Sequence, residues 1–185
     1  EMGAFWIGQF LAHGIPHRFV VAGASSTFDG ARLLADTKKI CETEIEFWHG
    51  KTRAKQQKPP FKSYVFLLNV VADGGGGLEH RNSTALLCKR DDLPRFGEVK
   101  QTNGYSGLLG LISHEYFHTW NVKRLHPADF SEFDYSQENY TEMLWFFEGF
   151  TSYYDDLLLR RSGLIDDAQY LEVLCKTVNH VWQTP

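Results

Sequence analysis

The sequence predicts an α+β fold in which a small β-sheet flanks a pair of long helices. Apolar stretches with strand composition occupy much of the first half, and two extended helical patterns cover residues 105–120 and 139–162. The chain has 185 residues, of which 43% are hydrophobic and 15% aromatic. It is therefore long enough to bury a sizeable core, and its composition is not that of a disordered protein.

The first elements follow from strand and capping patterns. Residues 1–25 are expected to be β-structure, with Arg18–Ala22 as the clearest strand. The segment Ser26–Asp29 carries a capping signal, which opens a helix that runs to about Trp48. Residues 50–60 are polar and rich in lysine, which is typical of a solvated connection.

The next segments predict a pair of strands. Ser63–Ala72 is a strongly apolar strand, and Thr84–Lys89 is its expected partner. Between them lie four consecutive glycines, Gly74–Gly77, which by themselves predict only a flexible turn.

The end of the chain is predicted to be helical. A loop over residues 126–137 leads into the helix over 139–162, for which Gly163 is a stop signal. Asp166 then caps a last helix that runs to about Trp182, and Gln169 completes a capping box.

Composition excludes several classes of protein. The net charge of −4 argues against a nucleic-acid surface, and no apolar run of about 18 residues predicts a membrane span. No signal peptide is visible, so a cytoplasmic and a periplasmic location both stay open. The three cysteines are few and widely spaced, so Cys41, Cys88 and Cys175 are expected to be free thiols in the core.

The helix expected over residues 105–120, with Asn103 or Ser106 as its cap, carries the pattern H-E-x-x-H at His114–His118. Positions i and i+4 lie one turn apart on the same face, so both imidazoles can reach one ion. Glu115 would lie beside that ion, where it can hold a water molecule. Two histidines with such a glutamate are typical of zinc hydrolases; the plainer alternative is a chance match in an amphipathic helix.

A zinc ion in such a site needs a third protein ligand and an open position for water. Glu148 is the best candidate, because it lies in a dense aromatic run where an unpartnered carboxylate would be costly. Its alternative role is a surface glutamate paired with Arg160 or Arg161. Four further residues are rivals for the third ligand: Glu132, Glu138, Glu142 and His126.

Several motifs together resemble the glycyl aminopeptidase family of zinc metallopeptidases. Two of them are His114–Arg124 and Glu148–Asp155, with Arg160–Leu164 behind the second. Another, Gly76–His80, is similar to the exopeptidase motif G-x-M-E-N of aminopeptidase N relatives. The resemblance covers residues 16–174 approximately, with the motifs in the expected order.

The resemblance implies a gluzincin (thermolysin-like) catalytic domain that holds one Zn²⁺ per chain through His114, His118 and Glu148. It also implies that Glu115 is the general base and that Glu79 binds the free amino terminus of a peptide substrate. Gly76, Gly77 and Leu78 would form the rest of that substrate subsite. Glu79 has a structural alternative, in which it merely pairs with a nearby lysine or arginine and supports its strand.

Family members carry a β-rich domain before the catalytic region and a PDZ domain after it. Residues 1–25 would then end the β-rich domain, and residues 26–185 would be an incomplete catalytic domain. The 29 residues between His118 and Glu148 agree with an insertion in this family. Relatives also place a transition-state tyrosine after the third ligand; here Tyr170 is the remaining candidate, without support from the sequence.

The predicted function is hydrolysis of N-terminal residues from peptides, and the family resemblance implies small ones such as glycine or alanine. Two alternatives stay open: an endopeptidase with the same zinc chemistry, and a non-catalytic peptide-binding protein on the peptidase fold. Glu79 distinguishes the first of these, because an endopeptidase has no use for a carboxylate that binds an ammonium group. An extended substrate is expected to add to the edge of the sheet.

Overall fold

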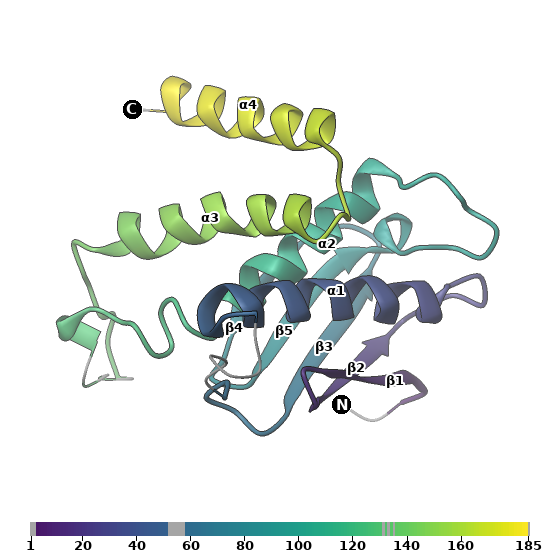
Figure 1. The fold of residues 1–185 in the computed structure, drawn as a ribbon, viewed down its shortest axis with the longest axis horizontal. Helices are drawn as coiled ribbons and strands as arrows, with labels where there is room; N and C mark the ends of the chain where they lie inside the picture. The colour runs from purple at the N-terminus through teal and green to yellow at the C-terminus, as the bar shows by residue number, and fades with distance from the viewer. Residues whose placement is uncertain (1–2, 52–57, 131, 133, 135, 185) are drawn as a thin grey trace.

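The computed structural model describes residues 3–51, 58–130, 132, 134 and 136–184, so part of the predicted lysine-rich loop, residues 52–57, lies outside the described residues. Within the described part, five strands form one mixed sheet (Figure 1). They are β1 (Phe5–Ala12), β2 (Ile15–Ala22), β3 (Tyr64–Val71), β4 (Gly76–Glu79) and β5 (Ser83–Lys89).

The strand order is β1-β2-β3-β5-β4, which makes β1 and β4 the edges of the sheet. β2, β3 and β5 run parallel, whereas β1 and β4 are antiparallel to their neighbours. The predicted combination of a small sheet with long helices is confirmed. The predicted division at residue 25 and the further domains stay predictions; in this chain β1 and β2 are continuous with the rest of the sheet.

The glycine run differs from its prediction. Gly76 and Gly77 are the first residues of β4, and they pair with Leu87 and Leu86 of β5. β5 is indeed a neighbour of β3, but the two are parallel and do not form a hairpin. The chain instead reverses after β3 through residues with positive φ, among them Gly74 at +133°, forms the edge strand, and returns as β5.

The first two long helices begin at side-chain caps. α1 covers Gly30–His49, and Asp29 accepts a hydrogen bond from the Arg32 backbone N–H. α2 covers Asn103–Phe117, and its cap is Thr102. The prediction of Asn103 or Ser106 as this cap is therefore wrong, because the preceding threonine is the residue with extended backbone and a free hydroxyl.

Of the last two long helices, α3 begins later than predicted, whereas α4 begins at its predicted cap. α3 covers Leu144–Arg161 and so begins later than residue 139; no side chain caps its start. The loop before it contains a short 3₁₀ turn, Ala128–Phe130. α4 covers Asp167–Gln183, and the capping box between Asp166 and Gln169 is confirmed.

The core lies between the sheet and α1 and α2, which cover one of its faces, while α3 packs on α2 and α4 is outermost (Figure 1). Phe19 and Phe66 stack on the sheet against Ile40 of α1 and Ile112 of α2, and all four are at most 1% exposed. Burial of each such side chain stabilises the fold by about 1.5–3 kcal/mol. α2 is apolar on most sides because the sheet and α3 cover it from opposite directions.

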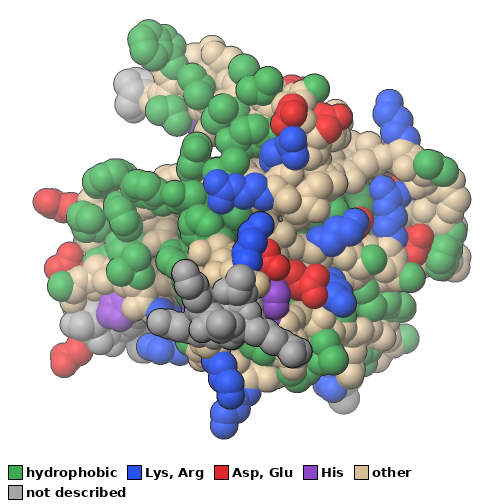
Figure 2. All heavy atoms as spheres, in the orientation of Figure 1, with side chains coloured by type: hydrophobic (Ala, Val, Ile, Leu, Met, Phe, Trp, Pro, Cys, Tyr) green, Lys and Arg blue, Asp and Glu red, His purple; other side chains and the backbone are tan. Residues whose placement is uncertain are grey.

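Hydrophobic side chains gather on the surface over α3 and α4 (Figure 2). Trp145 and Trp182 are 67% and 88% exposed, and α4 has no buried residue. Cys41 and Cys88 are buried free thiols, but Cys175 is exposed, because α4 is an outer helix that packs mainly on α3. None of the helices in the described residues is long and apolar enough to cross a bilayer.

Candidate metal centre

His114 and His118 lie one turn apart at the end of α2, and α3 brings Glu148 to the same point. The two Nε2 atoms are 3.1 Å apart. Oε2 of Glu148 lies 3.4 Å from Nε2 of His114 and 3.5 Å from Nε2 of His118. Among the described residues, these three form the one group of histidine, cysteine or acidic side chains compact enough to hold a metal ion.

This triangle has the dimensions of a zinc site. Tetrahedral zinc binds histidine nitrogen and carboxylate oxygen at roughly 2.0–2.2 Å, which places neighbouring ligand atoms roughly 3.3–3.5 Å apart. The three distances of 3.1, 3.4 and 3.5 Å fall close to that value. Two imidazoles and one carboxylate are also the donor set of a catalytic site, which leaves a fourth position open.

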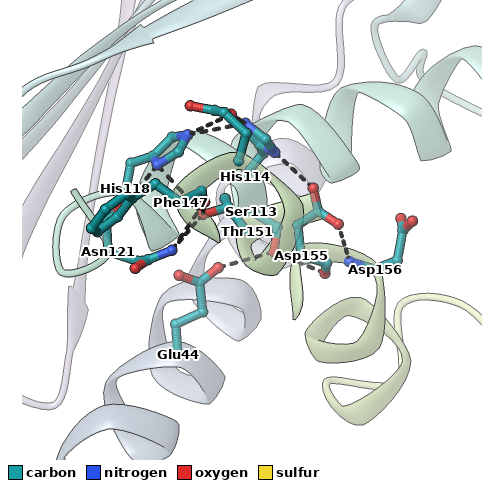
Figure 3. A network of polar contacts seen from close by, with 10 residues as sticks. Glu44, Ser113, His114, His118, Asn121, Phe147, Thr151, Asp155 and Asp156 are labelled. Atoms are coloured by element: carbon teal, nitrogen blue, oxygen red, sulfur yellow. Dashed lines mark hydrogen bonds and ion pairs between the residues drawn. The ribbon is translucent and has the colours of Figure 1, made fainter. Parts of the chain in front are cut away.

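The other nitrogen of each imidazole has a hydrogen-bond acceptor. Nδ1 of His114 lies 2.9 Å from Oδ2 of Asp155, and Nδ1 of His118 lies 2.9 Å from the backbone oxygen of Asn121 (Figure 3). An ionised carboxylate and a carbonyl only accept, so both rings donate Nδ1–H to them. Each Nε2 thereby faces Glu148, and it would offer its lone pair to a bound metal ion in place of a proton.

A buried polar chain supports Asp155 from behind. Ser113 Oγ lies 3.0 Å from Oε1 of Glu44 and 3.0 Å from the backbone oxygen of Asp155. Burial raises the pKa of Glu44, and its hydrogen bond with Ser113 opposes that rise. These contacts join α1, α2 and α3 directly behind His114 (Figure 3).

Asn121, in the turn after α2, ties the cluster to α3 on its other side. Its side-chain Nδ2 donates to the backbone oxygen of Phe147 and to Oγ1 of Thr151, both at 3.0 Å, and the residue is 3% exposed. Its own backbone oxygen accepts the proton of His118. Because Phe147 precedes Glu148, this one residue sets the positions of two members of the cluster relative to each other.

The electrostatics of the cluster favour bound positive charge. Burial alone would lower the pKa of His114, but hydrogen bonds to Asp155 and Glu148 outweigh it and raise the pKa to about 10. Hydrogen bonds from both histidines lower the pKa of Glu148, so its carboxylate is ionised at neutral pH. Burial raises the pKa of Asp155, and its hydrogen bond with His114 opposes that rise. Glu148 thus supplies the negative charge at the point where a divalent cation would bind.

Glu115 lies beside the cluster with its carboxylate packed against β4. The residue is 5% exposed, and its Oε2 has no hydrogen-bond partner in the part of the chain that the structure describes. Burial raises the pKa of Glu115, and the two nearby histidines oppose that rise. A methyl group added to Gly77 would overlap the Glu115 carboxylate, so the strand backbone itself forms one wall around it.

Glu79 faces the same side of β4 as Gly77. The two residues pair with Thr84 and Leu86 of β5, both of them buried on the helix-covered face, whereas Leu78 points the opposite way and is 58% exposed. Oε1 of Glu79 lies 2.9 Å from Nζ of Lys123. The ion pair expected under the structural alternative is therefore present; the substrate roles predicted for Glu79, Gly76, Gly77 and Leu78 stay predictions.

The rival ligands lie away from the cluster. Nδ1 of His126 contacts its neighbour's backbone oxygen, Glu138 accepts from the hydroxyl of Tyr140, and Glu132 and Glu142 are exposed. Glu148 is not paired with Arg160, which instead contacts Asp167.

Tyrosines occupy two different places around α3. A cavity of about 370 Å³ between α3 and α4 is lined by Glu148, Tyr153 and Tyr170, among others. Tyr154 instead packs against Phe117 of α2. Tyr170 therefore shares a cavity with one member of the cluster, and its role in the transition state stays a prediction.

Several residues of this site were not singled out from the sequence, among them Asn121, Lys123 and Asp155. Asp155 had a usable signal, because it lies seven residues after Glu148, about two helical turns along the same face. Asn121 and Lys123 had no comparable signal, because their partners lie on α3 and β4, far away in the sequence.

Two comparisons relate the chain to known proteins. Residues 107–185 match the family model described as M61 glycyl aminopeptidase. The chain is also similar to the crystal structure of an aminopeptidase N family protein from Idiomarina loihiensis, with 48% sequence identity and a TM-score of 0.84. This match covers 91% of the chain and 27% of that protein, so the chain spans about a quarter of its relative. No curated protein matches it in sequence.

Proposed function

We infer that this chain, a match to the M61 glycyl aminopeptidase family, carries the zinc-binding core of a peptidase that releases N-terminal residues. The observation that carries the proposal is the triangle of two Nε2 atoms and one carboxylate oxygen, with both Nδ1 atoms already bound to acceptors. Glu148 reaches the histidines from α3, a helix that follows α2, and this order supports the gluzincin type.

When bound, zinc would polarise the scissile carbonyl and lower the pKa of a water molecule to about 7. Glu115 would take a proton from the attacking water and later give it to the leaving amine. Its position supports this role, because an ionisable oxygen without a partner lies buried beside the cluster. Burial also raises its pKa, which makes the carboxylate a stronger base.

Substrate would lie along β4, the exposed edge of the sheet, and extend it by one strand. Glu79, at the end of β4 and on the same face as Gly77, would hold the substrate's ammonium group. Such a carboxylate limits how many residues fit between the amino terminus and the metal, which favours release of a single residue. The family resemblance adds glycine or alanine as the expected residue.

Metal content and N-terminal dependence test the proposal directly. Purified protein should hold about one zinc per chain by mass spectrometry, and the full-length enzyme should cleave alanyl peptides with a free amine. Equal cleavage of N-acetylated peptides would show an endopeptidase, and zinc binding without cleavage of either peptide would show a binding protein. A zinc-free protein that still cleaves would remove the proposal.

Zinc affinity should depend on the acceptor of His114. Asp155→Asn keeps a hydrogen-bond acceptor but loses the charge, so zinc should bind about 10–100-fold more weakly in competition with a chelator. Asp156→Asn is the matched control, because Figure 3 shows the neighbouring carboxylate pointing away from His114. Equal affinity in the wild type and in Asp155→Asn would show that Asp155 does not tune the metal.

The role of Glu79 predicts a loss that depends on the substrate's amino terminus. A charge-assisted contact with an ammonium contributes about 1.5–3 kcal/mol, so Glu79→Ala should lower kcat/KM for free-amine peptides roughly tenfold to a hundredfold. Cleavage of N-acetylated peptides, where measurable, should hardly change. If both substrates lose activity equally, Glu79 only supports its strand and the case for an aminopeptidase fails.

We propose the same domain arrangement for the full-length enzyme as for its family, with a β-rich domain before this region and a PDZ domain after it. The exposed apolar side chains of α3 and α4 support a longer enzyme, because large apolar patches in soluble proteins commonly contact another surface.

A further inference from the structure

Lys123 is a charged side chain in direct contact with the proposed substrate subsite, and the mechanism above does not use it. Its Nζ lies 2.9 Å from Oε1 of Glu79, and the two side chains are only 28% and 21% exposed. Lys123 follows His118 by five residues, and its backbone N–H donates to the backbone oxygen of His118. The turn that follows His118 therefore places the ammonium group of Lys123 next to the carboxylate of Glu79 on β4.

The backbone of the turn before Lys123 is strained, so contacts with the surrounding structure must hold Lys123 in this position. Val122 has φ of +128°, a region that β-branched residues almost never adopt and that costs on the order of 1–3 kcal/mol. Contacts on both sides hold the turn in that conformation. On one side, the side-chain amide of Asn121 donates to a backbone oxygen of α3. On the other, the guanidinium of Arg124 donates to the backbone oxygens of Thr119 and Arg81, each at 2.6 Å.

We propose that Lys123 is a specificity-determining residue whose ammonium occupies, at Glu79, the place that the substrate's amino terminus takes. The proposal rests on the proposed function of Glu79. Both groups are ammonium ions, so they need the same carboxylate and repel each other when both are close to it. Binding is thus an exchange: the flexible lysine stem swings out as the substrate's amino terminus enters.

This exchange has two consequences for turnover. The substrate gains only the difference between two similar ion pairs, so the subsite binds amino termini more weakly than an unpaired carboxylate would. The released amino acid still carries its ammonium, and the return of Lys123 to Glu79 displaces it. Lys123 would therefore raise KM and also reduce inhibition by product.

The test is Lys123→Met in the full-length enzyme, since methionine keeps much of the side-chain length without charge. KM for a free-amine alanyl peptide should fall about three- to tenfold, while kcat stays within about twofold. Inhibition by free alanine should become stronger by a similar factor. KM for N-acetylated peptides, where measurable, should not change. Lys123→Arg keeps the cation and should resemble the wild type, as should Lys100→Met, a change at an exposed lysine.

Other outcomes overturn the proposal. A higher KM in Lys123→Met would mean that the lysine holds Glu79 in place for the substrate, and an unchanged KM would mean a surface ion pair without a role in binding. Failure of the proposed function has a different signature. In that case the wild type does not cleave free-amine peptides, or Glu79→Ala leaves their kcat/KM unchanged.

Discussion

Glu115→Gln in the full-length enzyme is expected to lower kcat by about 10²–10⁴-fold while zinc content stays at about one per chain. Glutamine has nearly the shape of glutamate, so it fits the same buried place against β4. It cannot accept a proton from water, and the step assigned to Glu115 is lost. KM should change little, because the contacts proposed to bind the peptide lie on β4 and at Glu79.

Zinc analysis and steady-state kinetics on the same preparation check this prediction. Glu172→Gln makes the same change at a glutamate of α4 whose side chain is 62% exposed, and it should leave kcat unaltered. A zinc-loaded Glu115→Gln variant with near-normal kcat would assign the proton transfer to another group. Loss of zinc together with activity would instead give Glu115 a part in metal binding.

The histidine pair could be predicted from the sequence because its geometry is local. Spacing i, i+4 places His114 and His118 on one face of any helix, and their Nε2 atoms are indeed 3.1 Å apart. Glu148 required a different argument, because 29 residues separate it from His118. The cost of an unpartnered carboxylate among aromatic residues indicated it, and its place inside α3 did not depend on where that helix begins.

The residues around the cluster could not be predicted because tertiary packing determines their contacts. Asn121 has its partners on α3, and Lys123 has its partner on β4, so neither shows a spacing that a sequence pattern can detect. Gly76 and Gly77, the first half of β4, were predicted to belong to a turn, since glycine is depleted in strands and weakens them. Pairing with β5 outweighs that preference. The need for glycine at position 77 is visible only in the structure, where the Glu115 side chain packs against it.

Substitution of Gly77 is the second change for which we expect a large loss of activity. Gly77→Ala is expected to lower kcat/KM on the order of 10²-fold. A Cβ at this position would lie 2.3–2.5 Å from Oε1, Cδ and Cγ of Glu115, so the whole carboxylate end of that buried side chain must move. The φ of Gly77 does not lie in the left-handed region, so alanine meets no strain of its own there. Displacement of a catalytic group by about 1 Å can cost about 10²-fold in rate.

The matched control is Gly75→Ala in the same glycine run. The nearest atom to its added Cβ is the backbone oxygen of Leu87 at 3.9 Å, an ordinary contact, so activity and thermal stability should both be retained. A double variant decides whether the effect of Gly77→Ala passes through Glu115. In a Glu115→Gln background the base is already lost, so Gly77→Ala should cause little further loss of kcat/KM. If the two losses multiply instead, β4 acts on the substrate and not on the position of the base.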